Sequence, residues 1–535
     1  MRAVLVRPIY RTSRFDPETQ EPLGLETLAG YLRSYGHRVL LLDPMLDGLS
    51  EDLVARRTAG FEPDLVGFSA MSAGDYQSIK SILMKLRAIS PSAQRRIAVG
   101  GNSVSTEPEL LVKNLPPGTV GIRFEGERPI AELLTALEKG RDVETVSSTV
   151  IVDDEGNTTI NPPAPVIEEL DVLPFAARDL ASLLAQRRLP LNIQGSRGCC
   201  GSCSYCCAPG FPRSRAGSWR GRSPESLVEE MDAAVRDCGV RHFNFVDDDF
   251  LGPERPALRR VHDFAEALHA RRLTIAFSIQ ARPASLCLET VKALADAGVC
   301  HVFLGIENDD PRFLREWGRP LDHRAAWRGV EILREHGVET QIGCILFHPQ
   351  ATFEGVRRFA VRLRRMRLLN YRTATSRLHV LPGSRMHEEA AHDRRTLEVN
   401  MGAFVPPIGD QRLEKLHRTL ESILLPMRPS WVQAACRLPD WIASRRLASN
   451  REAVEAQKAL DGLREVLEEL DSVVGSVFFE LLDNFRLDKQ TAQRTAELRV
   501  TAFRAGERAA RRLSELNAVE SYDALREAIL RDGGP

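Results

Sequence analysis

Short apolar runs alternate with stretches of helical periodicity over the first 140 residues. The apolar runs predict five strands, over residues 3–6, 38–42, 65–68, 97–99 and 120–124. Between them, apolar positions recur at helical spacing, for example over residues 23–35 and 76–89. This alternation is typical of a doubly wound, Rossmann-like α/β sheet, in which ligands bind outside the carboxyl ends of the strands. We therefore expect a first domain over residues 1–140.

The alternation stops over residues 141–189. Apolar residues at 150–152 and 158–160 flank the turn-forming sequence DDEG, and a proline-rich stretch follows. This pattern predicts a β-hairpin and a linker.

A second alternation of strands and helices covers residues 190–390. The predicted strands lie at 191–194, 242–246, 274–279, 301–305, 340–346 and 373–379. Helical periodicity separates them, over residues 225–237, 255–271, 289–297, 324–335 and 354–365. Six such units predict a partial (β/α)6 barrel of the TIM type, with functional loops at the carboxyl ends of its strands. After Pro382 only helical periodicity is found, which predicts an all-helical domain over residues 391–535.

Composition narrows the class of protein. Apolar residues make up 43% of the chain, charged residues 27%, and the net charge is -1, which argues against disorder and against a nucleic-acid partner. The sequence has no run of about 18 apolar residues, the length that a membrane span needs. The apolar run at the N-terminus is too short for a secretory signal. We expect a cytoplasmic protein without a membrane span.

Five of the ten cysteines crowd between Cys199 and Cys207, directly after the first strand of the second alternation. Thiolates of Cys199, Cys203 and Cys206 in one loop suit three irons of a [4Fe-4S] cluster and leave the fourth iron open for a chelating ligand. The alternative is a zinc site that recruits Cys200 or Cys207 as its fourth ligand.

This loop resembles that of the radical S-adenosylmethionine (SAM) superfamily, as does Tyr205 before the last cysteine. The resemblance implies that Cys199, Cys203 and Cys206 bind a [4Fe-4S] cluster and that Tyr205 helps to bind the cofactor. In that family, SAM chelates the open iron, and its reductive cleavage yields a 5′-deoxyadenosyl radical that abstracts a hydrogen atom from the substrate.

Two further strand ends resemble the same family. Residues 243–250 read FNFVDDDF, and residues 305–308 read GIEN. The resemblance implies that Asp248 and Glu307 contact SAM, and Arg282 beyond the third strand is expected to face the SAM carboxylate. The alternative for Asp248 and Asp249 is the N-cap of the next helix.

The first domain resembles the cobalamin-binding subclass of radical SAM enzymes. The resemblance rests on the segments PLGL at 22–25, DLVGFS at 64–69, VGGNS at 99–103 and EGE at 125–127. It implies a cobalamin site that includes Ser69, Ser72, Gly100, Gly101 and Asn102, where glycines allow close approach of the backbone. The alternative is a doubly wound domain that binds nothing and only presents the barrel.

The loop after the first strand lacks the histidine that replaces the cofactor's own base in many cobalamin domains. Residues 7–13 read RPIYRTS, and His37 is the only histidine before the linker. We therefore expect no histidine below the cobalt, and the sequence alone places neither Tyr10 nor Arg11 beneath it.

The resemblance implies a cobalamin-dependent methyltransferase that acts on an unactivated carbon of a natural product, peptide or lipid. An electron donor such as flavodoxin or ferredoxin is then required. The same cofactors also support cyclisation or rearrangement without methyl transfer. An alternative of another class is a non-catalytic cobalamin or metal sensor, with the helical tail as its output module.

Overall fold

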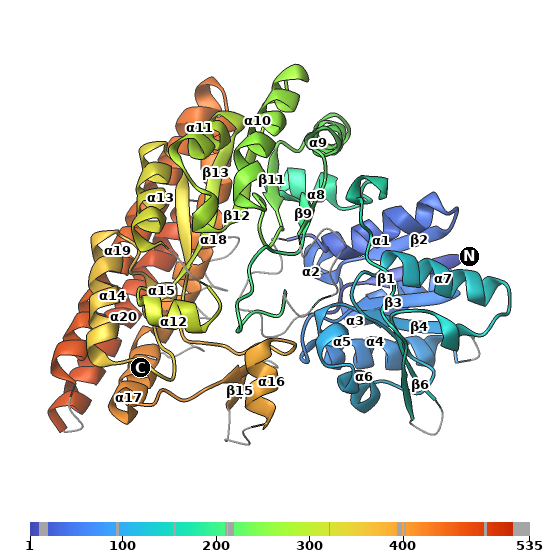
Figure 1. Cartoon of the computed structure of the whole chain (residues 1–535), viewed down its shortest axis with the longest axis horizontal. Helices are drawn as coiled ribbons and strands as arrows, with labels where there is room; N and C mark the ends of the chain where they lie inside the picture. The colour runs from blue at the N-terminus through green and yellow to red at the C-terminus, as the bar shows by residue number, and fades with distance from the viewer. Residues whose placement is uncertain are drawn as a thin grey trace.

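The structure is a computed structural model that describes residues 1–9, 20–91, 96–153, 157–208, 211, 219–319, 322–392, 398–400, 403–485 and 489–516. Figure 1 shows three parts: an N-terminal α/β part in blue, a central barrel-like part in green and yellow, and helices in orange and red, most of which lie on the side of the barrel away from the N-terminal part. The central part therefore connects the other two.

The first sheet has seven strands in the order β2-β1-β3-β4-β5-β6-β7. Its parallel strands are β1 (Arg2–Val6), β2 (Arg38–Leu42), β3 (Leu65–Ser69), β4 (Arg96–Gly100) and β5 (Val120–Ile122). Its helices are α1 (Leu23–Ser34), α2 (Pro44–Asp47), α3 (Glu51–Phe61), α4 (Asp75–Ile89), α5 (Asn102–Thr106), α6 (Glu109–Asn114) and α7 (Glu127–Glu138). The predicted doubly wound fold is confirmed.

The predicted hairpin consists of β6 (Thr149–Val152) and β7 (Thr158–Ile160), but it is part of the first sheet rather than of a separate linker. Strand β6 pairs antiparallel with β5 and is buried along its whole length. Burial of this apolar strand against the sheet explains the difference, because an unpaired hairpin would leave it in water.

The second sheet is parallel, with five strands in the order β14-β13-β12-β11-β8. They are β8 (Leu191–Ile193), β11 (His242–Phe245), β12 (Ala276–Ala281), β13 (Val299–Glu307) and β14 (Glu339–Cys344). The helices of this part are α9 (Pro224–Cys238), α10 (Glu254–Ala270), α11 (Leu288–Ala297), α12 (Pro311–Glu316), α13 (His323–Glu335) and α14 (Phe353–Arg365). This arrangement confirms the partial-barrel fold class.

The sixth predicted strand, over residues 373–379, is wrong as a strand. A capping box between Asn370 and Thr373 starts the short helix α15 (Tyr371–Ala374) at this place. Only one parallel bridge, between Phe347 and Arg377, continues the sheet pattern. The local capping hydrogen bonds therefore override the strand-like composition.

The C-terminal region is helical, as predicted, apart from the small antiparallel pair β15 (Glu398–Asn400) and β16 (Ala403–Val405). Its helices are α17 (Gln411–Leu424), α18 (Arg428–Leu447), α19 (Asn450–Asn484) and α20 (Lys489–Glu515). Helix α18 packs across the barrel sheet, where Ala443 lies against Ala276 and Cys300. In the part of the chain that the structure describes, no helix combines the length and the apolar character that a membrane span needs.

Arg178, in the segment between the two sheets, joins the N-terminal part to the barrel. Its guanidinium contacts Glu21 at 3.0 Å and Glu230 of α9 at 2.7 Å, and donates a hydrogen bond of 2.8 Å to the carbonyl of Asn192 in β8. These charged groups are buried and paired, so separating the two parts would leave uncompensated charges.

Candidate active site

A cavity of about 570 Å³ lies between the strand ends of the first sheet and the cysteine loop. Ser69, Gly100, Gly101 and Asn102 line it from the N-terminal part, at the carboxyl ends of β3 and β4. From the barrel it is lined by residues that include Arg197, Gly198, Cys206, Cys207 and Asp248. The volume lies within the range of small-molecule sites, and the place is where doubly wound sheets bind ligands.

Gly101 gives the loop after β4 its shape. Its φ of 105° lies in the region that favours glycine, and a Cβ at this position would lie 2.5 Å from the carbonyl oxygen of Ala70. The loop after β3 therefore packs directly on the backbone of Gly101. Ser72 does not line the cavity, and its backbone N–H donates to Asp75 at 2.8 Å.

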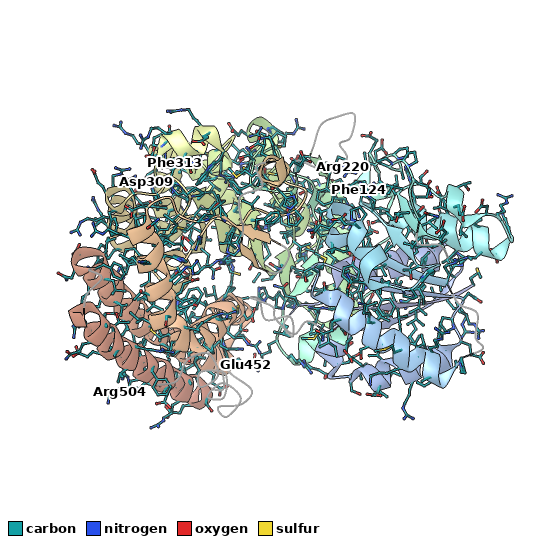
Figure 2. The ribbon with its side chains drawn as sticks, turned by 90° about the horizontal axis from the view of Figure 1, so that it is seen from below. Phe124, Arg220, Asp309, Phe313, Glu452 and Arg504 are labelled. Atoms are coloured by element: carbon teal, nitrogen blue, oxygen red, sulfur yellow. The ribbon has the colours of Figure 1, made fainter. Side chains whose placement is uncertain are left out.

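Aromatic side chains form part of the wall, which the sequence did not indicate. Phe124 follows β5 with a φ of 64°, and its N–H donates to the hydroxyl of Ser105 at 2.8 Å. The ring of Phe124 meets the ring of Phe211 edge-on, at 5.8 Å between centroids. Figure 2 places Phe124 beside Arg220, where the N-terminal part meets the barrel.

Ion pairs tie the cysteine loop to the N-terminal part. Arg197, two residues before Cys199, pairs with Glu127 at the start of α7, and Arg220 contacts Glu125 at 2.6 Å. Burial acts to raise the pKa of Glu125, but Arg220 and Arg197 lower that pKa below its ordinary value. The two sides of the cavity are therefore held together by charged groups.

Two thiols of the predicted cluster site face the same point. A Cβ on Gly201 would lie 3.5 Å from Cys199 Sγ and 3.7 Å from Cys203 Sγ, so these sulfurs flank the glycine. Burial raises the pKa of Cys199 to about 12, so this thiol is neutral until a metal displaces its proton. Cys206 lines the cavity, whereas Cys200 is exposed.

The cysteine loop rests on the turn after α12. The N–H of Ser204 donates to the carbonyl of Trp317 at 2.9 Å, and the Ser202 hydroxyl donates to the carbonyl of Gly318 at 3.1 Å. The ring of Tyr205 meets that of Trp317 edge-on at 5.9 Å. The Tyr205 hydroxyl is buried and has no hydrogen-bond partner among the described residues, which leaves it available to a ligand.

Glu307 ends β13 in a conformation that turns its side chain into the barrel. Its φ is 65°, and the pairing of β13 with β14 is irregular here. A Cβ on Gly343 would lie 2.8 Å from the Glu307 carboxylate, so glycine leaves the space that this side chain occupies. Burial raises the pKa of Glu307, although Arg319 opposes the shift.

Arg319, which no sequence motif indicated, joins the cysteine loop to Glu307. The guanidinium contacts Cys203 Sγ at 3.3 Å, donates to the carbonyl of Gly305 at 2.7 Å and lies 4.0 Å from the Glu307 carboxylate. Cys203 is a predicted cluster ligand, and a positive charge on its sulfur with a carboxylate nearby would suit a zwitterionic cosubstrate bound at an open iron.

The acids after β11 differ in their surroundings. Asp248 lines the cavity, whereas Arg282 Nε donates to Asp249 at 2.7 Å and Arg282 Nη2 donates to the carbonyl of Gly252 at 3.1 Å. The second carboxylate oxygen of Asp249 is buried without a hydrogen-bond partner among the described residues. The helix-cap alternative is wrong, because the N-cap of α10 is Pro253. The cosubstrate contacts of Asp248 and Arg282 stay predictions.

The described residues contain no group of three or more His, Cys, Asp or Glu side chains arranged around one metal ion. Tetrahedral zinc would need such convergence. The thiolates of a [4Fe-4S] cluster each bind a different iron, so they need not converge on one point.

Histidine is not among the described residues that line the cavity. His37 lies directly before β2, with Nδ1 3.4 Å from the N-terminal amine, and it does not line the cavity. Tyr10 and Arg11 lie outside the described residues. The expectation of a cobalt without a histidine ligand below it stays a prediction.

Protein-family models match both of the chain segments that line this cavity. The radical SAM superfamily model matches residues 193–361, and the B12-binding domain model matches residues 17–134. The chain belongs to the cobalamin-binding radical SAM enzymes. A radical SAM domain implies a [4Fe-4S] cluster and SAM, and a B12-binding domain implies cobalamin.

Relatives of this radical SAM enzyme differ in the reactions that their names state. A protein of Pyrococcus horikoshii described as an uncharacterized methyltransferase is 26% identical, over 81% of this chain and 92% of the relative. The anaerobic magnesium-protoporphyrin IX monomethyl ester cyclase of Rubrivivax gelatinosus is 26% identical, over 66% of this chain and 64% of the relative. The names of these two relatives therefore state different reactions.

The fold is similar to that of the cobalamin-dependent radical SAM enzyme OxsB. The solved structure with aqua-cobalamin has a TM-score of 0.74 and 18% identity, and the match covers 99% of this chain and 80% of that chain. The similarity therefore extends through the C-terminal helices, which neither family model reaches.

Proposed function

We propose that this enzyme transfers a methyl group to an unactivated carbon of a natural-product, peptide or lipid substrate. The observation that carries the proposal is the cavity whose lining includes both Asn102 of the B12-binding domain and Cys206 of the cysteine loop. Cobalamin and a SAM-derived radical would then act on one substrate in one space. The methyltransferase name of the Pyrococcus horikoshii relative agrees with this reaction.

The cofactors supply a carbon-centred radical and a methyl group, and the protein holds and orients them. Cys199, Cys203 and Cys206 would hold the cluster, with Arg319 on the Cys203 sulfur. Glu307 would accept hydrogen bonds from SAM. The loops after β3 and β4 would hold cobalamin, and the Phe124 ring would help to exclude water from the space between the cofactors.

The second candidate is cyclisation or rearrangement without methyl transfer. The magnesium-protoporphyrin cyclase name of a relative with similar identity favours it. Both candidates need an electron donor such as flavodoxin or ferredoxin to reduce the cluster, and both fit a cytoplasmic enzyme.

The products of SAM separate the two candidates. Anaerobically reconstituted, reduced protein is incubated with SAM, with and without cobalamin, and S-adenosylhomocysteine and 5′-deoxyadenosine are measured. Methyl transfer predicts both products, with S-adenosylhomocysteine formed only when cobalamin is present. If 5′-deoxyadenosine is the sole product in the presence of cobalamin, the rearrangement candidate replaces the methyltransferase.

A further inference from the structure

A second cleft, of about 770 Å³, lies where the barrel sheet meets the C-terminal helices. Its lining comes from the edge strand β14, from the C-terminal ends of α13 and α14, from residues around α15, and from α18 and α19. None of the residues that line it belongs to the lining of the first cavity. The cleft is therefore a separate site.

Positive charge dominates this basic cleft. Its charged lining residues are five arginines and three acids: Arg334, Arg364, Arg367, Arg372, Arg464, Glu339, Glu468 and Asp471. No ion pair within 4.0 Å involves Arg334, Arg367 or Arg464 among the described residues. The arginines thus outnumber the carboxylates, and three of them are not matched one to one with an acid.

The acids of the basic cleft neutralise less charge than their number implies. Burial raises the pKa of Asp471 to about 7, although the Trp431 indole donates a hydrogen bond of 3.0 Å to it. Asp471 is therefore only partly ionised at neutral pH. Burial also raises the pKa of Glu339, although the charges of Arg464 and Arg334 act to lower it.

Two of the guanidinium groups, those of Arg334 and Arg367, also repel each other. Shielding from water and the charge of Arg367 lower the pKa of Arg334, although Glu339 acts in the opposite direction. An anion placed between these groups would relieve the repulsion. Planar guanidinium groups bind phosphate and carboxylate in a bidentate manner, and a concave surface allows several to act together.

We propose that the basic cleft binds a small anionic ligand through a phosphate or carboxylate group. Arg372, which lines the cleft, lies over the ring of Phe303 on strand β13, at 5.0 Å from the ring centroid. The proposal does not depend on the type of reaction at the first cavity.

Calorimetric titration of the full-length protein with inorganic phosphate, and separately with tricarballylate, tests the site at constant ionic strength. At least one probe should show saturable binding. The probe with the higher affinity tells whether the cleft prefers a phosphoryl or a carboxylate group. The double variant Arg334→Gln/Arg464→Gln should weaken this binding by about tenfold or more. Glu339→Gln should act in the opposite direction and tighten it.

Arg324→Gln is the matched control. Arg324 lies on α13, the helix that also carries Arg334, and is exposed, but it does not line the basic cleft. Its replacement removes one positive charge, as each of the two substitutions of the double variant does, and should leave the affinity within about twofold of the wild type. The proposal is overturned if neither probe saturates, if the control loses as much affinity as the double variant, or if Glu339→Gln weakens binding.

Discussion

Replacement of Gly101 by alanine tests whether the loop after β4 is part of the cobalamin site. Gly101 has φ 105° and ψ -177°, a region that is essentially restricted to glycine and costs other residues about 1–3 kcal/mol. The added Cβ would also lie 2.5 Å from the carbonyl oxygen of Ala70, a backbone atom that cannot rotate away. We expect the backbone strain and the steric clash together to raise the free energy of the native loop conformation by about 3 kcal/mol. The loop would move to relieve this strain.

A loop shift of this cost should weaken cobalamin binding by up to about a hundredfold. The assay is titration of the purified protein with hydroxocobalamin, followed by absorbance, alongside thermal unfolding by circular dichroism. Gly60→Ala is the control, because a Cβ on Gly60 in α3 meets nothing within 4 Å and an alanine in a helix is favourable. Wild-type affinity in Gly101→Ala, or an equal loss in Gly60→Ala, would refute the reasoning.

Three further predictions address other parts of the molecule. Replacement of all three predicted cluster ligands, Cys199, Cys203 and Cys206, by alanine should abolish iron loading and SAM cleavage. Cys200→Ala should spare both. Iron analysis and measurement of 5′-deoxyadenosine report the two outcomes. Glu307→Gln should weaken SAM binding at least about tenfold while the iron content stays unchanged, and unchanged SAM affinity would return Glu307 to a structural role. Asp471 has a folded pKa of about 7, above its unfolded value, so the stability that it contributes is present below about pH 4 and is lost as pH rises through 7. Asp471→Asn should therefore flatten the fall in melting temperature between pH 5 and pH 8, and an unchanged fall would contradict the assignment.

The sequence predicted those parts of the fold whose local pattern and tertiary environment agree. Strands β1, β3 and β4 are apolar runs buried in a parallel sheet, and their bounds differ from the prediction by a residue or two. Periodicity failed at residues 373–379, because the capping box at Asn370 is a local hydrogen-bond pattern that strand propensity does not register.

Residues of the candidate site that belong to a local sequence motif could be predicted. Residues that reach the site only through tertiary contacts could not. The cysteine loop was predicted from the spacing of its thiols, and Glu307 from the resemblance of residues 305–308 to a motif of the radical SAM family. Arg319 comes from a loop beyond α12 and reaches Cys203 only through the tertiary fold. Phe124 was assigned to the end of a strand, but its positive φ turns the chain so that the ring lines the cavity.

The central claim is that cobalamin and the cluster share one cavity, and electron paramagnetic resonance tests it most directly. Protein loaded with Co(II) cobalamin and a reduced [4Fe-4S] cluster contains two paramagnets. Since Asn102 and Cys206 line the same cavity, the two centres should lie close enough for dipolar coupling, and the signals should split or broaden relative to protein that holds either centre alone. A spectrum equal to the sum of the two separate spectra would contradict the shared cavity.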